Sequence, residues 1–555
     1  MSTPSSALQL PPPAASRPPE CPPPAALSSV LTELHLTRVV PTLWCIGSHR
    51  PARFRLTPSH CVIEGVDSCT EETAWDDVLG AHVRTADGKP IDAAVDYTTG
   101  ADPNASFVLT LYVCGSQQLR PKTLKKRKTS EFVFRCTGQQ LPQVVRLQQC
   151  INFLADPRNQ ESVQKVETLD DLELVERPPR KYLVLVNPVS GPGRAMQIYE
   201  NKVALLFQHA NVTTDVKIMD HAQHATEAVM EMPLGVYDCV VGVGGDGTLY
   251  EIVQGLMKRA DWNRAIRQPI GVIPGGSGNG LAHSICHRSG EEGKPVNAAY
   301  ILAKGMPHNL DITSVSNGKE TTYSFLSLEW ASIADVDIGS ENLRMLGGLR
   351  FTVSFVNQLL FQRPDYPGKI WYLEEDENEN PPLYFEKHDP ESTDRPKMDL
   401  VVGKGQDLSG VLQQTTGEEI QTKTEKDAGK GGKWKELCGH FRVVWTMNVS
   451  HAASDAHVAP DAELDDGFNY ITLMDGSHSR RNLVAMMLAI ETGGHVDKKG
   501  VQHVRTRAFK IMPDRADDLM CVDGELMDGP YLEAEVHRGM ACIMAIPRCP
   551  RNSEK

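Results

Sequence analysis

Three short apolar runs, each followed at once by a glycine-rich turn, most constrain what this chain can fold into. The runs are residues 182–186 (YLVLV), 239–243 (CVVGV) and 270–273 (IGVI), and none of them alternates between apolar and polar side chains. Such runs predict strands that are buried on both faces, as in a parallel sheet. Amphipathic stretches follow at 195–209 and 249–258 and predict helices. The pattern therefore indicates an α/β domain.

The three turns predict a phosphate site. They read NPVSGPGR (187–194), GGDGT (244–248) and PGGSGN (274–279). The carboxyl ends of parallel strands share one edge of a sheet, and glycine turns before helices offer backbone N–H groups to anions. We therefore expect one nucleotide crevice, in which Asp246 is the acid–base group. The lysine-containing P-loop pattern and the dinucleotide fingerprint are both missing from these turns.

Length and charge bound the remaining possibilities. A chain of 555 residues predicts two or three domains. A net charge of -14 argues against a general nucleic-acid binder, although local basic patches remain possible. The 13 cysteines show no CxxC pair, which favours reduced core thiols in a cytosolic protein. No apolar run is long enough to span a membrane, so we expect a cytoplasmic protein with at most peripheral contact to intracellular or plasma membranes.

The first third of the chain predicts a separate β-rich domain. Residues 1–40 are dominated by proline and predict a disordered tail. Residues 41–157 contain short strand patterns and end in a helix over 141–154, an order that resembles a pleckstrin-homology-like barrel. Residues 158–180 predict a linker. The basic segment 120–128 (RPKTLKKRK) is expected at a hairpin loop, where it contacts an anionic membrane surface, forms an ordinary solvated loop, or serves as a nuclear localisation signal.

The last third predicts a mainly β domain over residues 309–549. Its acidic and then glycine- and lysine-rich segment, 374–434, predicts a disordered insertion. The apolar helix expected at 482–491 suits either the wall of a lipid-tail pocket or a buried core. Residues 327–352 include the carboxylates Asp337 and Glu341, which suit an ammonium, and the arginines Arg344 and Arg350, which suit phosphate oxygens.

Taken together, Asn187-Pro188, the GGDGT turn and the GSGN segment resemble the lipid kinase superfamily of diacylglycerol, ceramide and sphingosine kinases. Residues 327–352 closely resemble the sphingosine kinases. The resemblance implies an α/β catalytic domain at 181–308, ATP with Mg2+, and transfer of phosphate to the primary hydroxyl of a sphingoid base. In that family the Asp-Gly-Glu turn that matches Asp523 folds back to the nucleotide.

The resemblance also assigns roles residue by residue. Asp246 is the catalytic base, and Asp337, Glu341 and Ser277 bind the lipid, with Asp337 on its amine. Asp523 is expected to hold Mg2+ through water. The nucleotide-binding positions are Asn187, Pro188, Val189, Gly244, Gly245, Gly247, Thr248, Glu251, Gly276, Ser277, Gly278, Arg344, Arg350, Asp523, Gly524 and Glu525.

Two features of these motifs bear on the substrate. Asp335 precedes Asp337 by two positions, and this second acid favours a free amine over an amide. Gly244 stands where sphingosine kinases commonly have serine, which is the form used by diacylglycerol and ceramide kinases. The alternatives are therefore a ceramide or diacylglycerol kinase on the same fold, or a lipid-binding adaptor with little catalysis.

Overall fold

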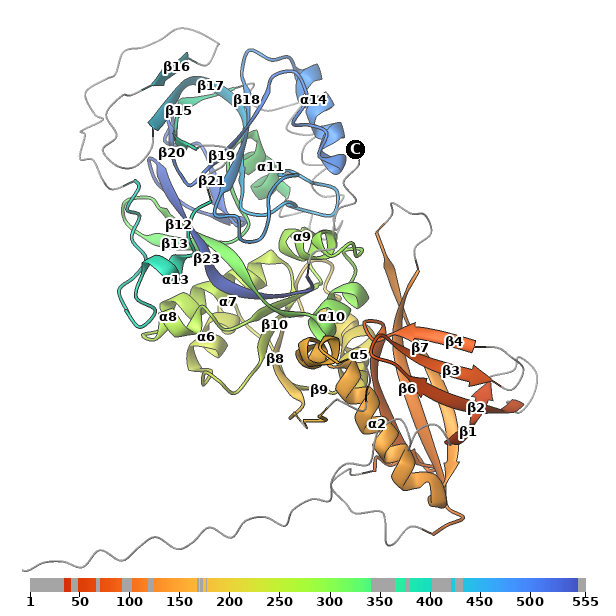
Figure 1. The fold of residues 1–555 in the computed structure, drawn as a ribbon. Helices are drawn as coiled ribbons and strands as arrows, with labels where there is room; N and C mark the ends of the chain where they lie inside the picture. The colour runs from red at the N-terminus through yellow and green to blue at the C-terminus, as the bar shows by residue number, and fades with distance from the viewer. Residues whose placement is uncertain are drawn as a thin grey trace, which may run out of the picture.

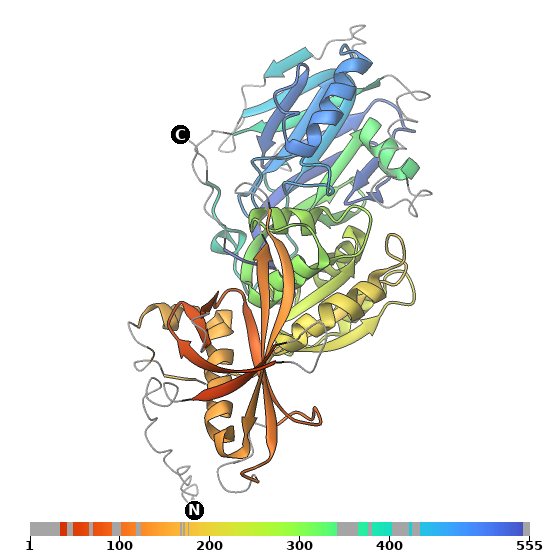
Figure 2. The ribbon, with the colours of Figure 1, turned by 90° about the vertical axis from the view of Figure 1, so that its right-hand side faces the viewer.

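A computed structural model describes most of the chain, and the account below is confined to those residues. They are residues 34–40, 48–65, 70–91, 102–117, 124–166, 169, 173–175, 177–340, 365–375, 380–401, 421–424 and 433–547. They form three lobes in a row, with an α/β lobe between an N-terminal β lobe and a C-terminal β lobe (Figures 1 and 2). None of the helices within these ranges is both long and apolar enough to cross a membrane.

The N-terminal lobe is an antiparallel sheet covered by one helix. Its strands lie in the order β4-β3-β2-β1-β7-β6-β5. The long hairpin β6–β7 confirms the predicted pairing of the two strands, and α2 confirms the predicted helix. The strands and helix are β1 (His35–Val40), β2 (Ser48–Leu56), β3 (His60–Gly65), β4 (Thr70–Ala74), β5 (Val78–Thr85), β6 (Ser106–Gln117), β7 (Lys126–Thr137) and α2 (Leu141–Ala155). β1 begins at His35, so the disordered tail predicted over residues 1–40 overlaps the first strand of this lobe.

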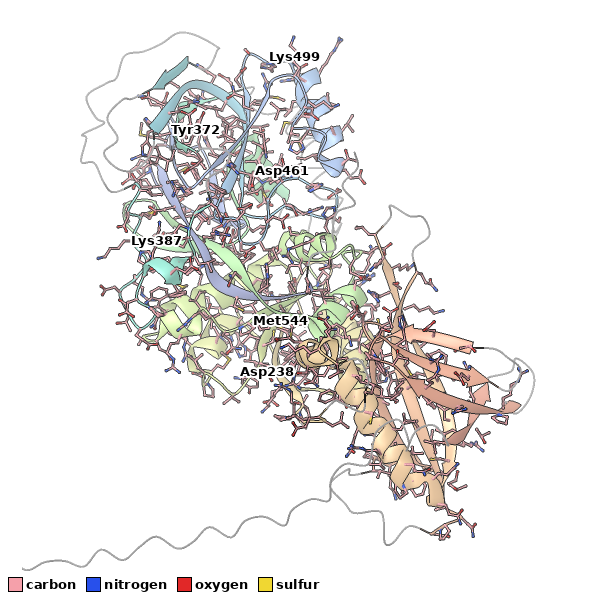
Figure 3. All side chains as sticks on the ribbon, viewed as in Figure 1. Asp238, Tyr372, Lys387, Asp461, Lys499 and Met544 are labelled. Atoms are coloured by element: carbon pink, nitrogen blue, oxygen red, sulfur yellow. The ribbon has the colours of Figure 1, made fainter. Side chains whose placement is uncertain are left out.

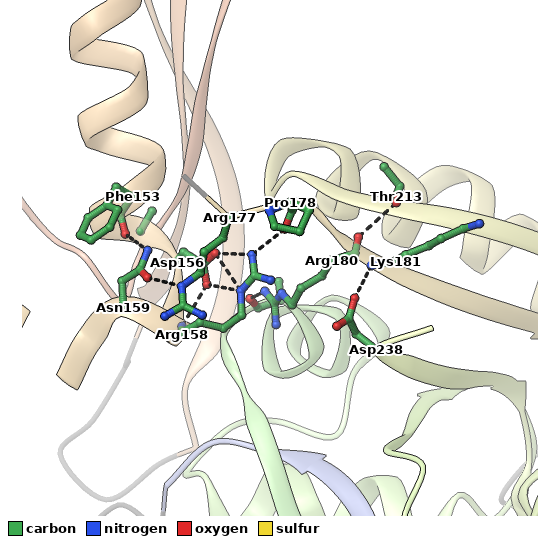
Figure 4. A network of polar contacts seen from close by, with 12 residues as sticks. Phe153, Asp156, Arg158, Asn159, Arg177, Pro178, Arg180, Lys181, Thr213 and Asp238 are labelled. Atoms are coloured by element: carbon green, nitrogen blue, oxygen red, sulfur yellow. Dashed lines mark hydrogen bonds and ion pairs between the residues drawn. The ribbon is translucent and has the colours of Figure 1, made fainter. Parts of the chain in front are cut away.

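The predicted linker is held in place at both ends. It begins with the short helix α3 (Gln160–Gln164). Figure 4 shows Arg158 paired with Asp156 at 2.6 Å and bonded to the carbonyl oxygen of Pro178 at 3.0 Å, and Arg177 donating to Asn159 at 2.9 Å. These contacts attach the described part of residues 158–180 to the end of the N-terminal lobe.

The central lobe contains the predicted parallel sheet in the order β9-β8-β10-β11. All three predicted strands are present, and every residue of β10 and β11 is buried. The strands are β8 (Arg180–Val186), β9 (Val212–Ile218), β10 (Cys239–Gly244) and β11 (Ile270–Pro274). The helices are α4 (Ala195–Ile198), α5 (Ala204–His209), α6 (His224–Glu231), α7 (Asp246–Lys258), α8 (Trp262–Ala265), α9 (Gly280–Arg288) and α10 (Pro295–Lys304), with a π-helical turn at Tyr199–Val203 between α4 and α5.

The C-terminal lobe is antiparallel and joins the central sheet through its last strand. The strands are β12 (Met306–Ser316), β13 (Thr321–Ser324), β14 (Ser327–Ala331), β15 (Tyr366–Glu374), β16 (Gln421–Thr424), β17 (Lys433–Met447), β18 (Asn469–Asp475), β19 (Val501–Thr506), β20 (Ala508–Pro513), β21 (Met520–Val522), β22 (Glu525–Leu526) and β23 (Leu532–Ala545). The helices are α11 (Ser332–Ser340), α13 (Tyr384–Lys387) and α14 (Arg480–Ala489). Ile543 of β23 pairs with Ile270 of β11, and Figure 3 shows the neighbouring Met544 at the central lobe.

The expectation that all of residues 374–434 is disordered is wrong for residues 380–401. This segment folds against the central lobe, where the indole N–H of Trp262 donates to the carbonyl oxygen of Thr393 at 2.9 Å. Asn263 donates to the carbonyl oxygen of Pro390 at 2.8 Å, and Tyr384 is buried against Trp262. An aromatic anchor with satisfied backbone groups outweighs the polar composition of its neighbours.

Candidate functional site

The three glycine-rich turns meet at the carboxyl ends of β8, β10 and β11. The backbone N–H of Asn187 donates to the carbonyl oxygen of Val243 at 3.0 Å. The N–H groups of Gly275 and Gly276 both donate to the carbonyl oxygen of Gly244, at 2.8 and 3.1 Å. These bonds join turns that lie far apart in the sequence into one crevice, as the sequence pattern predicts.

Glycine is required where these turns touch. A Cβ atom added to Gly276 would lie 2.5 Å from Cα of Gly245, which is closer than side-chain carbons approach backbone. A Cβ atom at Gly244 would lie 2.5 Å from Oγ1 of Thr248. The side chain of Thr248 therefore occupies the space that a side chain at position 244 would need.

Asp246 is the first residue of α7 and faces the start of α9. Its carboxylate accepts hydrogen bonds from the backbone N–H groups of Gly280 at 2.9 Å and Leu281 at 3.3 Å. Burial raises the pKa of Asp246 above its usual value, and these two donors only partly oppose the shift. The carboxylate is thus held in one orientation and is more basic than a solvated aspartate.

Asn279 is a site residue that the sequence reasoning quoted in a motif but left without a role. It adopts a left-handed backbone conformation with φ of 60° just before α9. Its side-chain amide accepts from the N–H of Gly276 and donates to the carbonyl oxygen of the same residue, both at 2.9 Å. Asparagine tolerates this backbone region better than most residues, so its position after a glycine turn was the available signal.

A cavity of about 620 Å³ opens on the crevice. Pro188 and Gly244 lie in the turns but do not line it. The predicted site residues that do line it are Asn187, Val189, Gly245, Asp246, Gly247, Thr248, Glu251, Gly276, Ser277, Gly278, Asp337, Asp523, Gly524 and Glu525.

Several lining side chains already have partners within the protein. Asn187 donates to Oγ1 of Thr248 at 3.2 Å, and Glu251 accepts from the N–H of Ala225 at 3.2 Å. By contrast, the buried hydroxyl oxygen of Ser277 has no hydrogen-bond partner among the described residues. A buried polar atom without a partner at a glycine turn is suited to a bound anion or hydroxyl.

Part of the cavity lining is apolar. It includes Leu326, Ile333, Val336, Val484, Met487 and Leu488. The last three come from α14, whose Leu483 and Met486 are buried in the core. This helix therefore contributes both to the core and to the cavity lining, and its contact with a lipid tail stays a prediction. The cavity combines glycine turns with apolar side chains, as ligand pockets commonly do.

Asp337 lines the same cavity from α11. An ideal Cβ atom at Gly524 would be 3.6 Å from Oδ2 of Asp337, and one at Gly247 would be 3.7 Å from Oε1 of Glu525. The turn after β21 thus lies beside Asp337 and also reaches the start of α7. This agrees with the expectation that the Asp-Gly-Glu turn near the end of the chain folds back to the central lobe.

Asp523, the residue predicted to hold Mg2+ through water, is hydrogen-bonded within the protein. Asp523 is 4% exposed, and its two oxygens accept four hydrogen bonds. The donors are the hydroxyl of Ser324 at 2.6 Å and the backbone N–H groups of Phe325, Leu326 and Ser327 at 3.1, 3.1 and 2.9 Å. Burial still raises the pKa of Asp523 to about 6. These donors hold the carboxylate against the β13–β14 turn, and its contact with Mg2+ stays a prediction.

Three predicted residues cannot be placed. Glu341, Arg344 and Arg350 lie outside the described residues, as do positions 120–123 of the basic segment.

The expectation that the basic segment contacts a membrane surface is corrected at Arg127. This side chain is 7% exposed, and its guanidinium pairs with Glu291 at 2.6 Å and contacts Asp77. It is therefore used inside the protein, where it attaches β7 to the connection between α9 and α10, and does not face a membrane. Lys126 and Lys128 on either side are exposed.

Comparison with known proteins shows which families and relatives this chain is similar to. A family described as the diacylglycerol kinase catalytic domain matches residues 181–315, and one described as the YegS C-terminal NAD kinase beta sandwich-like domain matches residues 431–543. The chain is 31% identical to sphingosine kinase 1 of Arabidopsis thaliana over 63% of its own length and 69% of that protein. It is 32% identical to sphingosine kinase 1 of Mus musculus, over 66% of this chain and 90% of that protein. It is 27% identical to sphingoid long chain base kinase 4 of Schizosaccharomyces pombe, over 60% of this chain and 68% of that protein.

Proposed function

This chain belongs to the sphingosine kinases, a branch of the diacylglycerol kinase-like lipid kinases, and we propose that its cavity transfers the γ-phosphoryl group of ATP to the primary hydroxyl of a sphingoid base. The observation that carries the proposal is the placement of Asp246. It stands where three glycine turns meet, in a cavity that is also lined by apolar side chains.

The glycine turns fit the phosphates of a nucleotide. Side chains are excluded where Gly245 and Gly276 touch, so backbone N–H groups can approach a phosphate closely. The unpartnered hydroxyl of Ser277 supplies one further donor. Arg344 and Arg350, assigned by resemblance, would add positive charge against the γ-phosphate.

Mg2+ would bind beside the nucleotide phosphates, close to the glycine turns. It would lower the charge of the phosphate oxygens in the transition state. Glu525, exposed beside Gly247, is the better placed carboxylate to meet its water shell, because Asp523 is already occupied.

Asp246 acts as the base in this reaction. It accepts the proton of the primary hydroxyl as that oxygen bonds to the γ-phosphorus, while the bond from phosphorus to the β–γ bridging oxygen breaks and ADP leaves. Its hydrogen bonds to Gly280 and Leu281 fix the carboxylate before substrate binds. Positioning of this kind supplies much of the rate in phosphoryl transfer.

Asp337 pairs with the protonated amine of the lipid, and the apolar wall that α14 contributes receives the hydrocarbon chain. Glu341 would support Asp337 from one helical turn away. An amide nitrogen carries no positive charge, so this arrangement favours a free base over ceramide. Diacylglycerol has no nitrogen at this position to pair with Asp337.

The N-terminal lobe serves membrane contact in this proposal. Its strand order with one C-terminal helix suits a pleckstrin-homology-like module, and the exposed Lys126 and Lys128 suit anionic headgroups. The protein would then be cytoplasmic and peripherally bound to intracellular or plasma membranes.

A lipid panel tests the proposal. Purified protein is assayed with labelled ATP and Mg2+ against sphinganine, ceramide and diacylglycerol. We expect turnover of sphinganine, at least 100-fold less turnover of ceramide, and loss of activity by orders of magnitude in Asp246→Asn. Equal turnover of ceramide would remove the role of Asp337. Full function of Asp246→Asn in a lipid-binding assay, with negligible turnover by the unaltered protein, would favour the adaptor alternative.

A further inference from the structure

Two histidines of the loop after β17 lie beside a third histidine on α9, a helix of the central lobe (Figure 1). The loop folds into a tight turn between them, in which the N–H of Ala452 donates to the carbonyl oxygen of Ala456 at 2.9 Å. The rings of His451 and His457 stack with their centroids 4.2 Å apart. The ring of His287 on α9 lies 4.8 Å from the first and 4.9 Å from the second. These three residues form a histidine cluster where two lobes meet.

The backbone holds the histidine cluster in place. The N–H of His451 donates to the hydroxyl oxygen of Ser284 on α9 at 2.9 Å. The N–H of His457 donates to the carbonyl oxygen of Ile490, just after α14, at 3.0 Å. Binding costs less when the groups that make the contacts are already positioned. The cluster is therefore arranged before a ligand binds.

The ring nitrogens of the cluster are spaced closely enough to bind one metal ion. Each residue offers one nitrogen, and these three atoms all lie within 4.8 Å of one another. Tetrahedral bonds of roughly 2.0–2.1 Å would place the nitrogens about 3.3 Å apart, so the donors need to close by at most about 1.5 Å. Nδ1 of His451 already bonds the hydroxyl of Ser450 at 2.8 Å, which leaves Nε2 for a metal. Metal-bound histidines usually have such a partner on the second ring nitrogen.

The chemistry of the cluster favours a transition metal over Mg2+. Burial, with His457 and His287 close by, lowers the pKa of His451 to about 2, so its ring is neutral near pH 7. Neutral imidazole is the form that binds metals, and it suits Zn2+, whereas Mg2+ prefers oxygen ligands. His287 and His457 are partly exposed, so an ion can reach the cluster from solvent.

The cluster is separate from the place predicted for Mg2+. Gly280, the first residue of α9, donates to the carboxylate of Asp246, and His287 follows seven residues later. Seven residues of helix span about 10 Å. The loop that carries the other two histidines also lines the cavity, for example through Ala456. An ion at the cluster would therefore fasten a wall of the cavity to the helix that orients Asp246.

We propose that His287, His451 and His457 bind one Zn2+ ion, with water in the fourth position, and that this ion fastens the loop after β17 to α9. Its role is structural, because the ion joins two lobes beside the cavity and lies away from Asp246. The proposal goes beyond the proposed function and does not depend on it, since zinc binding is measured without ATP or lipid.

Zinc binding is measured on the full-length protein after treatment with EDTA and gel filtration. We expect titration calorimetry with ZnCl2 to give one site that binds more tightly than micromolar, and X-ray absorption to show nitrogen neighbours at roughly 2.0–2.1 Å. His287→Asn and His457→Asn should each lose this site. Ser450→Ala should weaken binding by roughly 10- to 100-fold, because it removes only the partner of His451. Circular dichroism checks that each variant is folded, and Ser450→Ala decides if a histidine variant is not.

A second group of possible ligands provides the matched control. Asp220, His221 and His224 also offer atoms within 4.8 Å of one another, but they lie at the mostly exposed start of α6. His221→Asn/His224→Asn should keep the tight zinc site. Hydrogen exchange gives an independent readout. Zn2+ should slow exchange in residues 450–459 of the unaltered protein and leave it unchanged in His287→Asn.

The proposal is overturned if the unaltered protein binds no Zn2+, or if His287→Asn and His457→Asn bind it as tightly as the unaltered protein. Loss of the site in His221→Asn/His224→Asn would also overturn it, because the ion would then bind at α6. Slower exchange in His287→Asn would do the same. The lipid panel is scored separately, so failure of the zinc site and failure of the proposed function are distinguishable.

Discussion

Arg127 and Glu291, 164 positions apart in the sequence, form a buried ion pair between the N-terminal and central lobes. Nη2 of Arg127 lies 2.6 Å from Oε1 of Glu291, and Nε donates to both carboxylate oxygens at 3.0 and 3.1 Å. Asn297 donates to the same carboxylate at 2.8 Å. The two lobes therefore share a satisfied polar network and are not joined by the linker alone.

Removing one member of this pair should destabilise the protein. Glu291→Leu leaves the buried Arg127 with the partly exposed Asp77 as its remaining carboxylate, and losing one partner of a buried pair costs about 3–5 kcal/mol. The Arg127→Leu/Glu291→Leu double variant should lose less than either single variant, because no charge remains buried alone. Urea unfolding monitored by circular dichroism measures the difference, with the exposed Lys128→Ala as control. Equal midpoints for Glu291→Leu and Lys128→Ala would contradict the prediction.

Lys126 and Lys128 should account for membrane binding by β7 if the N-terminal lobe contacts acidic lipids. Each exposed basic residue contributes about 1 kcal/mol near an anionic surface, so Lys126→Ala/Lys128→Ala should bind roughly 30-fold more weakly. Flotation with vesicles rich in phosphatidylserine, at low and physiological salt, provides the measurement. The matched control removes two exposed lysines of the central lobe, Lys202 and Lys217. If both double variants bind like the unaltered protein, the basic segment is an ordinary solvated loop.

Gly244→Ser should impair this enzyme although serine is common at that position in its relatives. The added Cβ would lie 2.5 Å from Oγ1 of Thr248, so the turn carrying Asp246 must shift. We expect kcat to fall at least tenfold, and Gly244→Ser/Thr248→Ala to recover part of it because the obstructing atom is removed. A steady-state assay on sphinganine measures both. Gly115→Ala, where a Cβ meets only one atom at 4.0 Å, is the control. Normal activity in Gly244→Ser would show that the backbone moves freely here.

Much of the central lobe could be predicted from the sequence because its signals are local. Continuous apolar runs specify strands buried on both faces, and glycine turns mark where those strands end, so β8, β10, β11 and the meeting of their turns follow directly. The helix that carries Asp246 begins at that residue, directly after Gly245 of the turn.

What could not be predicted depends on contacts between distant segments. Nothing local marks Arg127 as buried, because its neighbours are exposed lysines and its partner Glu291 lies in another lobe. Nothing local shows that four donors from residues 324–327 hold the carboxylate of Asp523. The segment at 380–401 is polar in composition, but Trp262 holds it against the central lobe. In each case tertiary contacts outweigh composition.

Leu488 should matter for the lipid and not for the nucleotide. It is 79% exposed on α14 and lines the cavity beside other apolar side chains of that helix, Val484 and Met487. Leu488→Asp places a charge where the hydrocarbon chain is expected, so KM for sphinganine should rise about tenfold or more while KM for ATP stays within twofold. The exposed neighbour Glu491, changed to Gln, is the control. If only the KM for ATP rises, the hydrocarbon chain of the lipid does not bind beside Leu488.

The pH dependence of turnover should report the ionisation of Asp246. As a base it must be deprotonated, so kcat/KM should fall as pH is lowered through its pKa. Burial raises that pKa, and the fall should therefore begin at a higher pH than for a solvated aspartate, whose pKa is about 3.9. Asp246→Glu should keep an acid limb at reduced rate, whereas the residual turnover of Asp246→Asn should lose it, since asparagine does not titrate. The same acid limb in Asp246→Asn would assign it to another carboxyl group in the cavity and leave Asp246 without the role of base.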